Sequence, residues 1–139
     1  ADGYIVTNNH VIAGGPRDGY ERRIERWLRK TALDLLSAET AEYAALADVT
    51  VTRVAIGDPA GRWGSCASSG VIRYSWRLIL APPAVRRATV AHEVAHRIHM
   101  NHSPAFHAVV RQLFGKDPVR ERAWLRANAM RLHSFGRDS

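Results

Sequence analysis

Residues 92–107 decide the fold and read His-Glu-Val-Ala-His-Arg-Ile-His-Met-Asn-His-Ser-Pro-Ala-Phe-His. His92 and His96 are four residues apart, so on a helix they lie on one face, where two imidazoles can bind one metal ion. Glu93 falls between them, and its carboxylate can reach a water molecule on that metal. Zinc lowers the pKa of such a water to ~7. The pattern therefore predicts a zinc site with Glu93 as general base.

A catalytic zinc needs three protein ligands and an open fourth position. On a continuing helix His99 lies roughly 10 Å from His92 along the axis, too far to share the metal. His102 is favoured, because Asn101 tolerates the left-handed conformation that ends a helix and would let the chain turn back. The ten-residue spacing from His92 equals that of the zinc-protease pattern H-E-x-x-H-x-x-G-x-x-H, with His99 at the glycine. His107 or a carboxylate elsewhere stays open as the third ligand.

The composition is that of one ordinary folded domain. The chain has 139 residues, 46% of them hydrophobic, which is enough for one core and too few for two. No run of eighteen apolar residues predicts a membrane span, and no secretory signal is visible. The single cysteine, Cys66, excludes an internal disulfide and fits a reducing compartment. We expect a cytoplasmic protein.

The formal net charge is +7, from 20 Lys and Arg against 13 Asp and Glu. A basic surface attracts nucleic acid, acidic proteins and anionic membranes alike. However, residues 21–30 interleave their charges with an apolar stripe, which is typical of an ordinary solvated helix. A nucleic-acid partner therefore stays open, no membrane partner is expected, and the sequence does not indicate an oligomeric state.

Residues 1–19 form a short segment of different character, before a domain over residues 20–139. Tyr4–Ile12 resembles the segment with the catalytic histidine of HtrA-type serine proteases, but the chain has no matching nucleophile segment. We therefore interpret these residues as a short strand with His10 near its end. Residues 14–19, rich in glycine, predict a turn or linker.

The first half of the domain should contain a helix and two strands. From Tyr20 a helical period predicts a long amphipathic helix that backs the metal helix. Its expected apolar stripe is Ile24, Trp27, Leu28, Thr31, Leu35, Leu36, Tyr43 and Leu46. Strands are predicted over Val49–Ile56 and Val71–Leu80. Gly61–Gly70 lies between them as a loop or irregular strand.

The second half should be helical. Pro82 and Pro83 suit a helix start, so the metal helix should begin near Pro83, with Val90, Val94 and Ile98 buried. Ser103 is the expected N-cap of a helix that ends at Gly115. Asp117 should cap a last helix that starts at Pro118 and ends near Met130. Its inward residues would be Val119, Ala123 and Trp124, and the tail from Ser134 should fray.

Four motifs in order resemble one family. They are Arg62-Trp-Gly-Ser-Cys66, the segment Ile72–Pro82, His92-Glu-x-x-His96 and Asn101-His-Ser-Pro-Ala-Phe106. Together they look like the YgjP-like branch of the SprT-like zinc metallopeptidases, over about residues 18–132. The resemblance implies a minimal zincin fold, with His92, His96 and His102 binding one Zn²⁺ and Glu93 as general base. Two features depart from the family. A short stretch of different character stands in place of the usual β-rich amino-terminal segment. His107 stands where tryptophan is common, which adds a histidine that could lie near the metal without binding it.

The expected architecture is α+β, a small sheet packed on a long backing helix and on the active-site helix. The expected function is a zinc-dependent metallopeptidase, in which zinc-activated water attacks a peptide carbonyl and Glu93 moves the proton. Arg62, Ser65 and Tyr74 are candidate oxyanion donors, although Tyr74 could equally be a core residue. Two alternatives stay open: a DNA-associated SprT-like protease acting on DNA-bound proteins, and a zinc-binding module without catalysis.

The segment Gly64-Ser65-Cys66 is a candidate sheet edge for binding an extended substrate. Its glycine would let backbone approach a ligand closely, and Arg62 and Trp63 precede it. Cys66 is either a small buried hydrophobe or a thiol near the zinc that could bind or inhibit.

Overall fold

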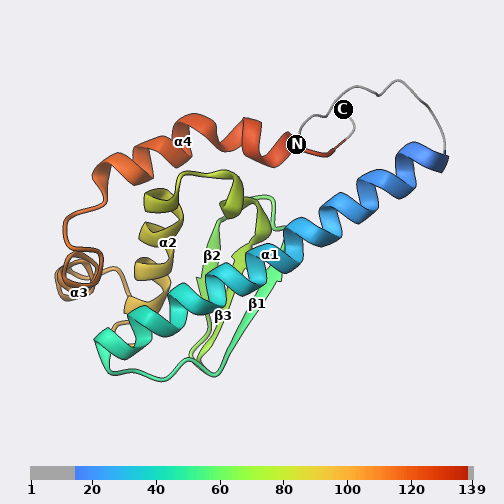
Figure 1. Ribbon diagram of the computed structural model, residues 1–139. Helices are drawn as coiled ribbons and strands as arrows, with labels where there is room; N and C mark the ends of the chain where they lie inside the picture. Colours follow the sequence, from blue (N-terminus) through green and yellow to red (C-terminus); the bar gives the residue numbers. More distant parts are fainter. Residues whose placement is uncertain (1–14, 138–139) are drawn as a thin grey trace.

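The computed structural model describes residues 15–137, shown in Figure 1. In chain order the elements are α1 (Gly15–Ala47), β1 (Arg53–Gly57), β2 (Gly64–Cys66), β3 (Val71–Ser75), the 3₁₀-helix η2 (Trp76–Leu80), α2 (Pro83–Ala95), α3 (Pro104–Phe114) and α4 (Val119–Ser134). Helices and a small sheet in separate stretches confirm the predicted α+β class. The strand predicted over Tyr4–Ile12, with His10, lies outside the described residues. Within those residues, every helix is too short or too polar to cross a membrane.

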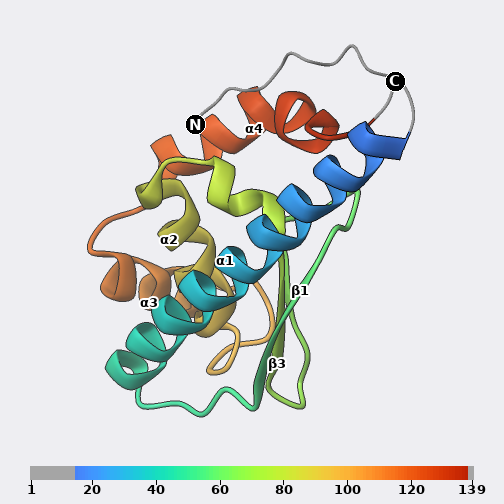
Figure 2. The ribbon, with the colours of Figure 1, turned by 45° about the vertical axis from the view of Figure 1, so that its right-hand side comes forward.

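The sheet has β3 in its centre. β1 pairs with β3 in parallel and β2 pairs with it antiparallel, so the order is β1-β3-β2. Helix α1 lies across the sheet, as Figures 1 and 2 show from two directions. Ile72 and Tyr74 of β3 are buried, and the hydroxyl of Tyr74 lies 2.8 Å from Oγ1 of Thr40 on α1. The order confirms that Gly64–Cys66 is an edge strand, whereas β1 covers only the second half of the strand predicted over Val49–Ile56.

The central strand is shorter than predicted. β3 ends at Ser75, whose Oγ accepts a hydrogen bond from the backbone N–H of Arg77 at 3.2 Å and caps η2. The prediction of one strand over Val71–Leu80 is therefore wrong in its second half. A hydroxyl that satisfies the first free N–H stabilises a helical turn there. The largely apolar sequence of residues 76–80 gave no sign of this cap.

Helix α1 begins at Gly15, so the turn predicted over residues 14–19 is wrong where the structure describes it. The buried side chains of α1 are Ala32, Leu36, Glu39, Thr40, Tyr43 and Ala44. Trp27 and Leu46, both assigned to the buried stripe, are 64% and 66% exposed. Trp27 precedes the buried Ala32 by five residues and therefore lies on a different face of the helix. Only the middle and end of the helix back α2.

A buried ion pair joins α1 to α2. The guanidinium of Arg86 donates to both carboxylate oxygens of Glu39 over 2.6–3.0 Å, and both residues are buried. Arg87 adds a hydrogen bond to Glu42 at 2.7 Å. Removing one partner of a buried pair leaves an uncompensated charge, so the geometry of the pair restricts how the two helices can shift. The backing role predicted for the long helix is confirmed.

A second buried arginine holds the carboxyl end of the chain. Arg77 is 2% exposed, and its Nε donates to Asp58 at 2.7 Å while Nη1 donates to the carbonyls of Leu132 and Phe135. Arg137 pairs with the same Asp58 at 2.8 Å. The guanidinium of Arg77 thereby holds the pKa of Asp58 well below its usual range. The expectation that the tail frays from Ser134 is wrong for the residues described.

Helix α4 differs from its prediction in its cap and its inner face. It begins at Val119 without a side-chain cap and continues to Ser134. Its buried residues are Glu121, Leu125 and Leu132, whereas Val119 is 55% exposed. The predicted inner face is therefore wrong at Val119 and Ala123, whereas Trp124 is half-buried and packs against the core. The apolar periodicity of this arginine-rich segment is too weak to predict which face of the helix is buried. The contact with α2 decides that face instead.

The turn before β3 yields a stability prediction. Gly70 and Gly115 share a backbone φ of +99°, but a Cβ on Gly70 would collide with Oγ1 of Thr52, and one on Gly115 would meet nothing within 4 Å. We expect Gly115→Ala to lower the free energy of unfolding by about 1–2 kcal/mol, the cost of a left-handed backbone. Gly70→Ala should lose a further ~1–3 kcal/mol from overpacking. Urea denaturation measures both, and equal losses would contradict the packing of Gly70 against Thr52.

Candidate metal centre

Helix α2 presents His92 and Glu93 from its last two turns. Pro83 occupies a first-turn position, where its missing N–H costs no hydrogen bond, and the helix start is as predicted. Val90 and Val94 are fully buried in the core. The helix also contacts β2 and α4. Ile98, the third residue of the predicted buried stripe, is 44% exposed because the helix has ended before it.

The chain reverses earlier than the sequence predicted. α2 ends at Ala95, and His96 is its C-cap with ordinary right-handed backbone angles. The following N–H groups of Arg97 and Ile98 donate to carbonyls three residues back, which tightens the last turn. Among the described residues, the only non-glycine with positive φ is Asp48. The left-handed turn expected at Asn101 is therefore wrong, although the reversal itself occurs.

The next helix returns His102 to the site. Ser103 caps α3 as predicted, its Oγ accepting from the N–H of Phe106 at 3.2 Å, and Gly115 ends the helix in the left-handed conformation. Phe106 is fully buried. Its ring lies 4.9, 4.5 and 5.0 Å from the ring centroids of His92, His96 and His102. One aromatic ring thus supports all three imidazoles and holds their orientation.

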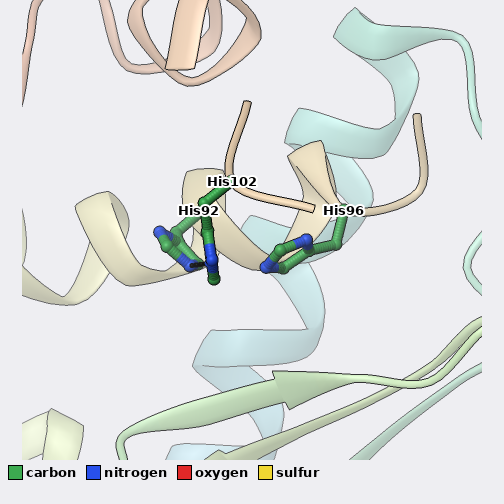
Figure 3. Close-up of side chains that lie close together, drawn as sticks. All are labelled: His92, His96 and His102. Carbon is green, nitrogen blue, oxygen red and sulfur yellow. Dashed lines mark hydrogen bonds between the residues drawn. The ribbon is translucent and has the colours of Figure 1, made fainter. Parts of the chain in front are cut away.

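Figure 3 shows the three imidazoles converging. The Nε2 atoms of His92 and His102 are 3.3 Å apart, and one ligand atom from each of the three histidines lies within 4.8 Å of the others. In a tetrahedral site with metal–nitrogen bonds of about 2.0–2.1 Å, two ligand nitrogens lie roughly 3.3–3.4 Å apart. The donor set therefore fits one metal ion, and its third member is His102.

Hydrogen bonding and burial favour the ligand form of these rings. Nδ1 of His96 lies 3.1 Å from the backbone carbonyl of His99, so Nδ1 carries the proton and Nε2 is left as the acceptor. Burial, followed by the charges of the neighbouring His96 and His102, lowers the pKa of His92 to about 4. Burial also lowers the pKa of His96. Both rings are then neutral at pH 7, as metal binding requires.

Glu93 lies buried beside the histidines, with 5% of its surface exposed. Burial raises the pKa of its carboxyl to about 7, and the positive charge of Arg62 acts in the opposite direction. β2 approaches this carboxylate through Gly64, where a Cβ would come within 3.0 Å of Cγ and Oε2 of Glu93. The absence of a side chain at Gly64 lets the edge strand lie directly against the carboxylate.

The candidate oxyanion donors lie in different surroundings. Arg62 is exposed and lines the same cavity as Glu93, so its charge reaches the site. Ser65 and Tyr74 line a separate cavity of about 220 Å³ that also includes Arg62. Tyr74 is 1% exposed and its hydroxyl is 2.8 Å from Oγ1 of Thr40, the environment of a packed core residue.

The remaining candidates are not in the three-histidine cluster. Cys66 is partly buried, and its thiol donates to the carbonyl of Ala67 at 3.6 Å. Burial, together with the nearby Glu93, raises the pKa of Cys66, which favours the protonated thiol. The ring of His107 stacks on that of His102 with centroids 6.3 Å apart, near the cluster but outside it. His99 contributes its carbonyl to His96.

A cavity of about 400 Å³ opens beside His92 and Glu93. It lies between the start of β2 with the segment before it, one face of α2 from its first turn to Glu93, and the first turns of α4. Its lining is Arg62, Trp63, Gly64, Val85, Ala88, Thr89, His92, Glu93, Pro118, Glu121, Arg122, Leu125, Arg126 and Ala129. The buried carboxylate and one of the three histidines therefore face a space large enough for part of a ligand.

Sequence reasoning missed three contributors. Phe106 was quoted only as part of a motif, although its spacing of four from His102 could have suggested contact between the rings. The carbonyl of His99 leaves no mark in the sequence, because any residue has one. The role of Gly64 against Glu93 depends on a contact between distant segments, so local pattern could not reveal it.

Comparison with known proteins gives one match. A family model described as YgjP-like, metallopeptidase domain, matches residues 5–128, and this range includes the three histidines, Glu93 and the edge strand. No curated protein and no solved structure matches the chain.

The geometry predicts which histidines hold a metal. Removing a group that merely orients a ligand weakens metal binding by about 10- to 100-fold, so removing a ligand should weaken it by at least ~100-fold. We expect this for His92→Ala, His96→Ala and His102→Ala, measured as zinc affinity by competition with a chelator. His99→Ala is the matched control and should retain zinc, because its contribution is a backbone carbonyl. Tight zinc in His102→Ala would contradict the ligand set.

Proposed function

Because the chain belongs to the YgjP-like metallopeptidase domain family, we propose that it is a zinc-dependent metallopeptidase with Glu93 as its general base. The observation that supports this most is the convergence of three imidazoles beside a buried carboxylate at the wall of a cavity. Three neutral nitrogen ligands with room for a further ligand are typical of catalytic rather than structural zinc.

Zinc held by His92, His96 and His102 would lower the pKa of a water ligand and polarise a peptide carbonyl. The chain's own residues supply the rest. Glu93 would take the proton of the attacking water at its carboxylate and later pass it to the leaving amine. Its pKa of about 7 suits both acceptance and donation near neutral pH. Phe106 would keep the imidazoles in place throughout.

The free edge of β2 is the proposed binding place for the substrate backbone. The carbonyl of Trp63 accepts from Ser75 and the N–H of Ala67 donates to Val71, both across to β3 at 2.9 Å. In an antiparallel pair, bonded and non-bonded residues alternate. Gly64 and Cys66 therefore direct their backbone groups away from β3. An extended peptide could pair with them beside Glu93 without any demand on its sequence.

Removal of the proposed base is the first test. We expect Glu93→Gln to keep the fold and zinc but to lose about 100- to 10,000-fold of the rate of casein cleavage, since general-base catalysis contributes this much. Glu25→Gln, the same chemical change on α1, removes only an i,i+4 ion pair with Arg29 and should leave the rate unchanged. A Glu93→Gln rate within tenfold of the native protein would remove Glu93 from this role. Zinc binding without any cleavage by the native protein would instead indicate a metal-binding module.

Gly64 gives a second, independent test. A methyl group there would push on Cγ and Oε2 of Glu93 at 3.0 Å, so the carboxylate must move. Because small displacements of catalytic groups are costly, we expect Gly64→Ala to reduce cleavage by roughly 10- to 100-fold while zinc content stays full. Gly61→Ala, where the new methyl group meets nothing within 4 Å, should be unaffected. Full activity in Gly64→Ala would contradict the close approach of β2 to Glu93.

A further inference from the structure

The cavity beside Glu93 combines an apolar lining with three arginines. Its apolar part comes from Trp63, Val85, Ala88, Leu125 and Ala129, and its arginines are Arg62, Arg122 and Arg126. We propose that this cavity binds a peptide carboxylate adjacent to an apolar side chain, so that the preferred substrates carry both groups next to the bond that is cleaved. The inference rests on the proposed peptidase function and specifies its substrate class.

The apolar part of the cavity is suited to a side chain rather than to bulk water. Val85 and Leu125 are at least nine-tenths buried and belong to α2 and α4, which lie on different sides of the space. A volume of about 400 Å³ can hold a large aliphatic or aromatic side chain with part of its backbone. His92 and Glu93 line the same space, so a side chain placed there belongs to a residue beside the reacting bond.

The arginine charges are largely uncompensated. Among the side chains that the structure describes, neither Arg62 nor Arg126 forms an ion pair. Arg122 has one contact, with the exposed Asp117 at 3.5 Å. Exposed ion pairs at this distance contribute little, so Arg122 remains available. The planar guanidinium group of an arginine can donate two parallel hydrogen bonds to a carboxylate. Unpaired arginines beside an apolar pocket therefore suit a carboxylate ligand.

The field of these arginines reaches the reacting groups from two sides. Arg122, on α4, lines the same cavity as His92. Arg62, on the segment before β2, lines this cavity together with Glu93. A carboxylate entering between α4 and β2 would therefore meet positive charge close to the scissile bond.

Glu121 is the group that could instead favour a cationic substrate. It lines the cavity but is 8% exposed, and its Oε2 pairs with Lys116 at 3.4 Å. Its Oε1 is buried from solvent without a hydrogen-bond partner. Neither oxygen is therefore presented to an incoming cation, and Lys116 compensates the charge. The accessible charges of the cavity are the arginines, which favours an anionic ligand.

Peptide binding to the zinc-loaded Glu93→Gln protein tests the inference without turnover. The probes share the acetylated sequence Ala-Ala-Phe and differ only in the group that follows. They are the free C-terminal carboxylate, the C-terminal amide, and extensions by amidated Asp, Asn or Lys. Calorimetry gives each dissociation constant. The free-acid and Asp peptides separate a chain-terminal carboxylate from a side-chain carboxylate.

We expect at least one carboxylate peptide to bind more tightly than its neutral counterpart, by about tenfold for a charge-assisted pair at a partly exposed site. Arg122→Gln and Arg126→Gln should each remove most of that difference and leave amide binding unchanged. Arg120→Gln is the matched control, since it removes the same charge from α4 outside the cavity lining. It should keep the full preference.

Equal affinities for charged and neutral peptides would overturn the inference, and so would a preference for the Lys peptide. An equal effect of Arg120→Gln would also overturn it, because the preference would then arise from net charge alone. These outcomes are distinct from failure of the proposed function. A native protein that cleaves casein without any carboxylate preference refutes only the inference, whereas selective binding by a native protein without cleavage refutes only the peptidase.

Discussion

Three imidazole nitrogens can share one metal ion only if the chain reverses between His96 and His102, and this constraint governs the centre of the molecule. α2 meets it by ending at Ala95, so that His96 is already part of the turn. The carbonyl of His99 then holds Nδ1 of His96, and Ser103 starts the helix that brings Phe106 beneath the rings. The metal centre is therefore made by backbone geometry and one aromatic ring as much as by its ligands.

The remaining elements hold α2 in place against this turn. α1 supports its back through the buried pair of Glu39 and Arg86, while Arg77 joins η2, the segment after β1 and the end of α4. These contacts leave one side of α2 open between β2 and α4, where the cavity lies. The pKa of Glu93 is raised because β2 and α2 exclude water from it, so the same packing that forms the cavity prepares the proposed base.

Much of the site could be predicted from sequence because local signals determine it. Proline and serine mark the starts of α2 and α3, a glycine ends α3, and the spacing of the histidines favoured the set that the structure brings together. Features set by distant contacts could not be predicted. Trp27 is apolar and on a helical period, yet it is exposed because packing buries a different face of α1, which includes Ala32 and Leu36. The left-handed turn at Asn101 was a plausible way to reverse the chain, but a tightened turn after Ala95 does so instead.

X-ray absorption at the zinc edge of the zinc-loaded protein tests the central claim most directly, because it reports the ligands of the ion itself. The account predicts a first shell of three imidazole nitrogens and one oxygen, at about 2.0–2.1 Å, without sulfur. A zinc–sulfur distance of about 2.3 Å would place Cys66 on the metal and contradict the three-histidine centre. A shell with only two imidazoles would contradict the convergence of His102 with His92 and His96.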